Sequence, residues 1–240
     1  MEVRAQILIN KDEEITTRYL GPWEGQPRRQ EKIARNWKFI CDCTRCKDPS
    51  DIATYFSAIK CQACLNKLGV NDSNQGPTSD ILSKTASGEN SYLLPNDVQM
   101  LGTPWQCNAC GFRQNRGEIE RILESLDEAL VQIKSEALAI DSNDLSKLAD
   151  YIKLSINRVH TKVHPNHFLL FQFKNWFLQL HLPDHLCLPK IQHRISTGIH
   201  TDLSGQISFL ELQMEYRSDI LKIIEVLDPG LTINLSLIHI

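Results

Sequence analysis

The chain has 240 residues, a mass of 27.4 kDa, a formal net charge of −3 and a pI near 6.2. Its 42% hydrophobic and 23% charged residues are typical of a globular protein with a substantial core. The weakly negative charge excludes a globally basic nucleic-acid-binding chain, and no run approaches the roughly 18 to 20 apolar residues that span a bilayer. The length accommodates one large domain or two smaller ones.

The first elements predicted along the chain are β-prone. Residues 2–9 alternate apolar with polar side chains, which is typical of a half-buried strand, and residues 14–20 form a second short β-prone run. Residues 26–37 have Pro27 near their start and helix formers after it, so they predict a short helix. This helix leads directly into the first cysteines of the chain.

The same segment carries a cluster of basic side chains. Such a cluster is either a solvated helix face or a phosphate-binding surface, and the negative net charge of the chain favours the first interpretation. The five residues are Arg28, Arg29, Lys32, Arg35 and Lys38.

The chain beyond residue 60 divides into two segments that differ in composition and in hydrophobic pattern. Residues 60–116 predict a loop-rich segment held by metal, with a polar, disordered insertion at about 70–91. Beyond Arg116, apolar residues recur at steps of three and four, which predicts amphipathic helices in an antiparallel array. Their apolar stripes cover residues 119–133, 145–159, 169–180 and 207–224, and a D-P-G sequence from Asp228 ends the last. The predicted fold class is α+β, with a small β-rich region bearing cysteine zinc sites before an all-helical domain.

The N-terminal sequence has no apolar run of signal-peptide length, which favours an intracellular location, cytoplasmic or nuclear. In a reducing compartment, the eight cysteines are more plausible as metal ligands than as disulfides.

Two C-x-x-C knuckles are the strongest chemical signal. Cys61 with Cys64, and Cys107 with Cys110, each have the spacing that turns two thiolates onto one ion, with backbone N–H groups donating to sulfur. Gly111 suits the positive φ that such turns often need. Two separate reduced turns or one redox-active pair are alternatives, but a thioredoxin-like motif needs a βαβ context that the pattern does not show. Four thiolates leave no position for water, so we expect structural zinc.

A C-x-C-x-x-C triplet, formed by Cys41, Cys43 and Cys46, suits three ligands on one ion. A closed tetrahedral site needs a fourth. That ligand is either Cys187, which otherwise reads as a buried apolar side chain, or a group outside this chain. A catalytic three-ligand zinc is a further alternative, although the triplet contains no glutamate or histidine that could act as a base.

Three histidines at helix-like spacing, His160, His164 and His167, suggest a metal site. Pro165 interrupts the spacing, so H-P-N-H is more typical of a helix start.

Two motifs in the first fifty residues resemble a known family. They match the patterns A-x-x-x-I-x-x-G-E-E-I-T-x-x-Y and W-x-F-x-C-x-C-x-x-C-x-D-P, which belong to the C-terminal end of a SET domain and its post-SET zinc motif. The resemblance is to the SMYD (SET and MYND domain) lysine methyltransferases, particularly the arthropod branch. Asp12 replaces the glycine of G-E-E, a tolerable departure if that turn needs no positive φ. The matching positions are Glu13, Glu14, Ile15, Thr16, Tyr19, Trp37, Phe39, Cys41, Cys43, Cys46, Asp48 and Pro49.

The resemblance continues through C-x-x-C … L-L-P … W-x-C-x-x-C-G, matched by Cys61, Cys64, Leu93, Leu94, Pro95, Trp105, Cys107, Cys110 and Gly111. The later V-H-P-N-H-F-L-L and L-D-P-G sequences look like the family's helical domain. The implied domains are the C-terminal part of a SET domain (1–40), a post-SET zinc motif (41–60), a four-cysteine zinc module (61–115) and a helical domain (116–240).

The family resemblance also implies roles for individual residues. Tyr19, which by itself would read as a core aromatic, matches the active-site tyrosine, and Phe39 matches the aromatic residue that packs on the adenine of S-adenosylmethionine. Cys41, Cys43 and Cys46 match three post-SET zinc ligands, whose fourth partner in the family is the cysteine of an N-H-S-C motif. These 240 residues contain no N-H-S-C, no glycine-rich SET strand and no MYND finger.

Zinc and S-adenosylmethionine are therefore the implied cofactors, and a protein is the implied substrate. About forty residues before the triplet are too few to enclose S-adenosylmethionine, so we expect a fragment that does not methylate by itself: a gene-model piece, a short isoform or a decayed copy. The alternative is a non-catalytic zinc-binding module that binds a protein partner.

Overall fold

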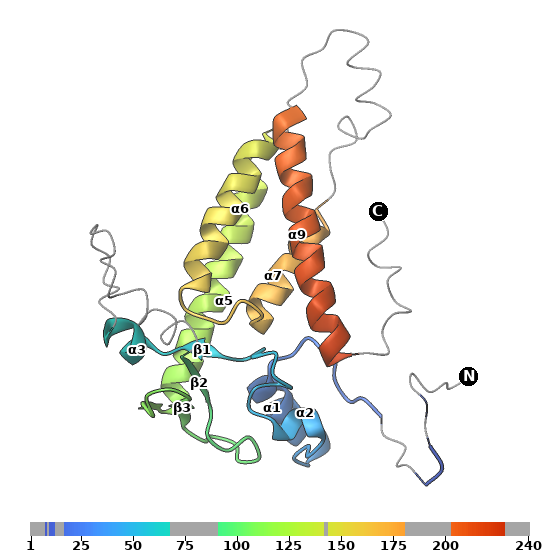
Figure 1. Ribbon diagram of the computed structural model, residues 1–240, viewed down its shortest axis with the longest axis vertical. Helices are drawn as coiled ribbons and strands as arrows, with labels where there is room; N and C mark the ends of the chain where they lie inside the picture. The colour runs from blue at the N-terminus through green and yellow to red at the C-terminus, as the bar shows by residue number, and fades with distance from the viewer. Residues whose placement is uncertain are drawn as a thin grey trace.

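The computed structural model describes residues 8, 10–12, 17–67, 91–141, 144–180 and 203–228. Their helices are α1 (Gln26–Trp37), α2 (Thr44–Lys47), α3 (Gln62–Lys67), α5 (Arg116–Ala139), α6 (Leu145–His160), α7 (Phe168–Leu178) and α9 (Leu203–Leu227). Their strands are β1 (Ile59–Lys60), β2 (Tyr92–Pro95), β3 (Trp105–Cys107) and β4 (Arg113–Gln114). The fold is α+β, as predicted, with a small sheet below a tall helical array (Figure 1). Among the described residues, none of the helices combines the length and apolar character needed to cross a bilayer.

Helix α1 confirms the predicted helix over residues 26–37. Pro27 lies in its first turn, where no intrahelical N–H bond is lost, and Gly25 precedes it in an extended conformation. Lys38 ends the helix with φ 62°, and its N–H donates to the carbonyl of Ala34 at 3.1 Å. The helix thus stops immediately before the cysteine triplet.

The four strands form one antiparallel sheet in the order β1-β2-β3-β4. The sheet therefore belongs to the four-cysteine segment. Of the β-prone runs predicted over residues 2–9 and 14–20, only residues 8 and 17–20 are described, and none of these lies in a strand. Ile59 forms an isolated bridge with Val163, and the N–H of Lys60 donates to the carbonyl of Lys162 at 2.9 Å. These contacts join the sheet to the helical region.

Helices α5, α6, α7 and α9 confirm the four predicted amphipathic helices. Consecutive helices alternate in direction, and α9 packs against both α6 and α7 (Figure 1). Helix α5 begins at a capping box, in which Asn115 accepts from the N–H of Glu118 and the Glu118 carboxylate accepts from the N–H of Asn115. Helix α9 ends at Leu227, directly before Asp228, as the D-P-G sequence predicts.

One hydrophobic core runs through the sheet and the helices. Its members include Leu93 and Trp105 of the sheet together with Ile119 of α5 and Phe173 of α7, all at most 1% exposed. The four-cysteine segment and the helical region are therefore packed as a single unit. The insertion predicted at about 70–91 falls almost entirely on residues 68–90, outside the described residues.

Candidate metal centres and an aromatic cluster

The two C-x-x-C knuckles face one another. The Sγ atoms of Cys61 and Cys110 are 3.7 Å apart, those of Cys64 and Cys107 are 3.8 Å apart, and all four lie within 4.8 Å of one another. Zinc–sulfur bonds of about 2.3 Å at tetrahedral angles put neighbouring sulfurs about 3.8 Å apart. The same distances are far longer than the roughly 2.05 Å of a disulfide. The four cysteines can therefore hold one zinc ion.

The second knuckle has the geometry that its spacing predicts. Cys107 ends β3, and its Sγ accepts from the N–H of Ala109 at 3.4 Å and from that of Cys110 at 3.5 Å. Gly111 has φ 71°, and its N–H donates to the carbonyl of Cys107 at 3.1 Å. A side chain at this φ would be strained, so the glycine allows the turn to close.

Three of the four thiols are buried, and Cys110 is exposed. Burial raises the pKa of Cys61 to about 12. By contrast, a hydrogen bond from the backbone of Phe112 lowers the pKa of Cys110 to about 7. A zinc ion would hold all four as thiolates and would supply the positive charge that buried thiolates require. A closed shell of this kind is structural, because no coordination position is left for water.

The Sγ atoms of Cys41, Cys43 and Cys46 also lie within 4.8 Å of one another. Cys46 is buried, Cys41 is half-buried and Cys43 is exposed. A hydrogen bond from Cys46 lowers the pKa of Cys43 to about 5, and the same contact raises the pKa of Cys46. Within the described ranges no fourth histidine, cysteine or carboxylate joins the group, and Cys187 lies outside them.

Two glutamine side chains hold the triplet in place. The Gln30 amide of α1 donates to the carbonyl of Cys41 at 2.7 Å and accepts from the N–H of Cys41 at 3.0 Å. Gln99 donates to the same carbonyl at 3.3 Å and to that of Cys46 at 3.5 Å. The loop is thus fixed by protein contacts on two sides.

A buried cluster of charges lies under the triplet. The Asp51 carboxylate, fully buried, accepts from Arg29 at 2.5 Å, from Arg45 at 3.0 Å and from the hydroxyl of Ser57 at 3.1 Å. Burial alone would lower the pKa of Arg29, but Asp51 and Cys46 beside it raise that pKa. Two guanidinium groups on one carboxylate leave a net positive charge next to Cys46. This charge opposes the Cys43 contact and the burial that raise the pKa of Cys46, and it therefore favours the thiolate that a metal needs.

The motif residue Asp48 shapes the turn that carries this carboxylate. Its side chain accepts from the N–H groups of Ser50 at 2.8 Å and Ile52 at 2.9 Å. The chain then passes through the left-handed region at Asp51, Ile52 and Ala53, with φ between 55° and 59°. Sequence reasoning missed this turn, because none of these residues is a glycine.

The two predicted cofactor residues lie together in an aromatic cluster, defined by Tyr19, Trp37 and Phe39. The Tyr19 ring meets the Trp37 ring edge-on at 5.3 Å and the Phe39 ring at 5.2 Å. The three residues are 45%, 42% and 36% exposed, so the cluster is open to solvent. Phe39 precedes the triplet by two residues, which places the cluster next to the candidate zinc site.

The turn before Tyr19 does not meet one expectation. Asp12 replaces the family's glycine, and the sequence predicts that this change is tolerated if the turn needs no positive φ. The φ of Asp12 is 67°, so the condition is not met. Aspartate enters the left-handed region more readily than most residues because its side chain can hydrogen-bond locally. The turn therefore has a backbone that glycine would adopt at lower cost.

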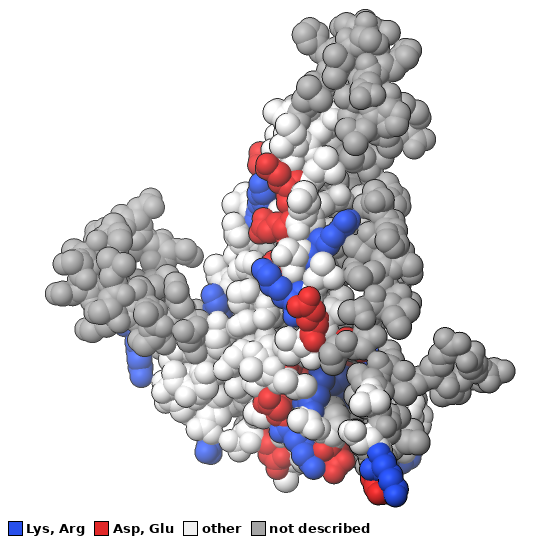
Figure 2. Space-filling model, turned by 45° about the vertical axis from the view of Figure 1, so that its right-hand side comes forward, with Lys and Arg blue, Asp and Glu red and all other residues white. Residues whose placement is uncertain are grey.

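The basic residues of α1 and its C-cap all have partners. Arg28 pairs with Asp127 and lies over the ring of Phe168, and Arg29 is the buried partner of Asp51. Lys32 pairs with Glu24, and Arg35 pairs with Glu31. Lys38 donates to the carbonyl of Arg35. Figure 2 shows blue and red side chains interspersed on this part of the surface. The segment is a salt-bridged helix face.

Two of the three histidines, His164 and His167, have structural contacts, and His160 is the last residue of α6. His164 stacks on Tyr55 at 5.2 Å, and His167 caps α7 by accepting from the N–H of Leu169 at 3.3 Å. Burial lowers the pKa of His164 to about 4 and that of His167 to about 3. The interpretation of H-P-N-H as a helix start therefore holds.

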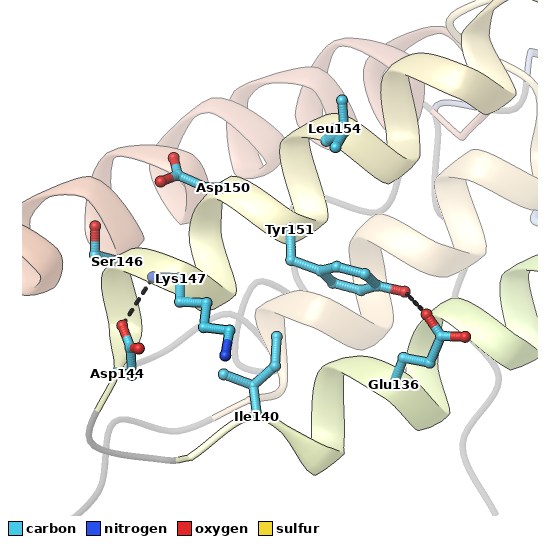
Figure 3. A pocket seen from close by; sticks show the side chains of 8 residues that line it. All are labelled: Glu136, Ile140, Asp144, Ser146, Lys147, Asp150, Tyr151 and Leu154. Atoms are coloured by element: carbon cyan, nitrogen blue, oxygen red, sulfur yellow. Dashed lines mark hydrogen bonds between the residues drawn. The ribbon is translucent and has the colours of Figure 1, made fainter.

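An open groove of about 540 Å³ lies between α5 and α6 (Figure 3). Its contacts are structural: the Tyr151 hydroxyl donates to the Glu136 carboxylate at 2.5 Å, and Asp144 caps α6 by accepting from the N–H of Lys147 at 3.0 Å. None of the described cysteines or cluster aromatics lines this groove.

Comparison with known proteins finds similarity over a short part of the chain. No family model and no solved structure matches. The chain is 44% identical over 46 residues to histone-lysine N-methyltransferase SET5 of Candida glabrata, which covers 19% of this chain and 9% of that protein. It is 48% identical over 40 residues to SET5 of Meyerozyma guilliermondii and 45% identical over 40 residues to SET5 of Candida albicans, covering 17% of this chain and 8% of each relative.

The chain thus spans about a tenth of the length of the curated relatives it matches. The class that fold and similarity support is an α+β protein with zinc-capable cysteine clusters and a segment like that of SET-type histone-lysine methyltransferases. These fungal proteins do not extend the similarity to the SMYD branch in particular.

Proposed function

We propose that this chain is part of a SET-type, S-adenosylmethionine-dependent protein-lysine methyltransferase of SMYD type. The observation that carries the proposal is the contact between Tyr19 and Phe39, 5.2 Å apart, next to a triplet of thiols. The similarity to SET5 proteins supports the methyltransferase relationship. The substrate would be a lysine of a histone or another protein, in the cytoplasm or the nucleus.

In this proposal, each residue has a limited task. S-adenosylmethionine, when bound, supplies an activated methyl group, and the protein supplies geometry. The face of Phe39 would hold the adenine, and the hydroxyl of Tyr19 would orient the lysine amine. Zinc on the triplet would fix the loop that follows Phe39, so that the aromatic face stays in place.

We further propose that the chain does not methylate by itself. Methyl transfer requires the reacting groups to be enclosed and aligned. Tyr19 and Phe39 are 45% and 36% exposed, so residues beyond those described must cover them before a cofactor can be enclosed. The fourth ligand of the triplet would come from the same covering part.

A methylation assay tests the proposal. The zinc-loaded chain is incubated with S-adenosylmethionine carrying a tritiated methyl group, with and without histones, beside the matched variant Tyr19→Phe. We expect label at background level for both proteins. Robust labelling by the unmodified chain, lost in Tyr19→Phe, would show that the cofactor site is complete and would overturn the claim of inactivity.

A non-catalytic zinc-binding interaction module is the second candidate. The closed four-thiolate arrangement, continuous with the hydrophobic core, favours it. In this case the helices and the zinc-held sheet would bind a protein partner without any methyl transfer. Saturable binding of S-adenosylmethionine would contradict this second function.

A further inference from the structure

The residue directly before Tyr19 contacts the end of helix α9. Arg18 forms a bidentate salt bridge with Asp228, with Nη1 2.6 Å from Oδ2 and Nη2 2.6 Å from Oδ1. In Figure 1 the segment that precedes α1 passes beside the lower end of α9. Two parallel charge-assisted bonds fix an orientation as well as a distance.

Asp228 is buried at the end of α9. It follows the last turn of α9, and its N–H donates to the carbonyl of Ile224 at 2.8 Å. Its side chain is 2% exposed, whereas that of Arg18 is 40% exposed. Exposed ion pairs are weak, but a buried carboxylate without its partner is costly, so the pair is held closed.

A second contact holds the chain on the other side of Tyr19. The ring of Trp23 stacks on Phe171 of α7 at 4.8 Å and 20°, and Gln172 of α7 donates to the Trp23 carbonyl at 3.4 Å. Both flanks of Tyr19 are therefore tied to the helical region, one to α9 and one to α7. Between them, the ring of Tyr19 rests against Trp37 and Phe39.

We propose that Asp228 is a positioning residue, which acts through Arg18 to hold the Tyr19 ring against Trp37 and Phe39. The helical region thus sets the geometry of the aromatic cluster. Without this bidentate salt bridge, residue 18 is no longer held beside α9, and the Tyr19 ring loses its contacts with Trp37 and Phe39. The meaning of this position for methyl transfer rests on the proposed function, whereas the positioning itself is tested without any cofactor.

The test uses ¹⁹F NMR of the full chain labelled with 3-fluorotyrosine. The chain has five tyrosines, and the resonance of Tyr19 is assigned as the one lost in Tyr19→Phe. In Asp228→Asn we expect this resonance to move toward that of free 3-fluorotyrosine, because the ring-current shifts from Trp37 and Phe39 are lost. Arg18→Lys keeps the charge but cannot form the bidentate salt bridge, so a smaller shift of the Tyr19 resonance in the same direction is expected.

Asp127→Asn is the matched control. It removes the partner of Arg28, which ties α1 to α5, and we expect the Tyr19 resonance to stay in place. An unchanged Tyr19 resonance in both Asp228→Asn and Arg18→Lys would overturn the proposal. A concerted change of all five resonances in both variants would also overturn it, because the pair would then stabilise the fold generally. Failure of the chain to bind S-adenosylmethionine would leave these expected shifts intact.

Discussion

Replacing Cys107 with serine tests the four-cysteine centre most sharply. The Cys107 thiol is buried, 3% exposed, and it faces Cys64 at 3.8 Å while accepting two backbone N–H bonds. A serine hydroxyl has nearly the same shape but does not ionise to a soft anion. The change therefore removes one of four thiolates with little change in packing.

The expected loss of zinc affinity is at least about 100-fold, or about 2.7 kcal/mol. This is a lower bound, because losing an outer partner of a metal ligand already costs about 10- to 100-fold. The strands around the site have two to four residues, and isolated strands of that length are marginal. Much of the free energy of zinc binding is therefore expected to stabilise the sheet.

The assay is competition for zinc with a chromogenic chelator, alongside urea denaturation with and without added zinc. Cys43→Ser is the matched control, because it removes a thiol from the other group and is expected to leave this centre intact. Wild-type zinc affinity in Cys107→Ser would refute the assignment of these four cysteines to one ion.

The remaining predictions concern metal content, pH and packing. Chelator titration of the zinc-loaded chain is expected to give one resistant zinc and a second that is weak or absent; two equally resistant ions would mean that the triplet has a further ligand, with Cys187 the first candidate. Burial lowers the pKa of His167 to about 3, against an ordinary value near 6.5, so between these values only the unfolded chain binds the proton. Stability from this residue is present above pH 6.5 and falls by about 1.4 kcal/mol per pH unit well below it. His167→Gln is expected to flatten the fall measured by urea denaturation between pH 7.5 and 5.5, and an unchanged slope would contradict the assigned pKa. Phe173→Ala is expected to lower the free energy of unfolding by about 3 to 5 kcal/mol, because this fully buried ring lies in the shared core. A loss below about 1 kcal/mol in the same denaturation experiment would argue against that core.

Local signals predicted five of the seven described helices, but none of the four described strands. Apolar residues that recur every three or four positions predict α5, α6, α7 and α9. The C-x-x-C spacing with Gly111 predicts the second knuckle. Each of these signals lies within one helix or one turn. Short-range periodicity and spacing are therefore enough to read them.

The contacts that arrange the candidate site have no such local signal. Asp51 meets Arg29 from 22 positions away, and Arg18 meets Asp228 from 210 positions away. Family resemblance pointed to Tyr19 and Phe39, but their contact is created by tertiary packing. Charged partners brought together from distant segments cannot be paired by spacing alone.

We propose that this chain carries part of a SET-type cofactor site and not all of it. Calorimetric titration of the zinc-loaded chain with S-adenosylmethionine tests it most directly. We predict no saturable heat, because the aromatic cluster of Tyr19, Trp37 and Phe39 is open to solvent. Binding of one S-adenosylmethionine per chain at micromolar affinity, lost in Phe39→Ala, would contradict the account.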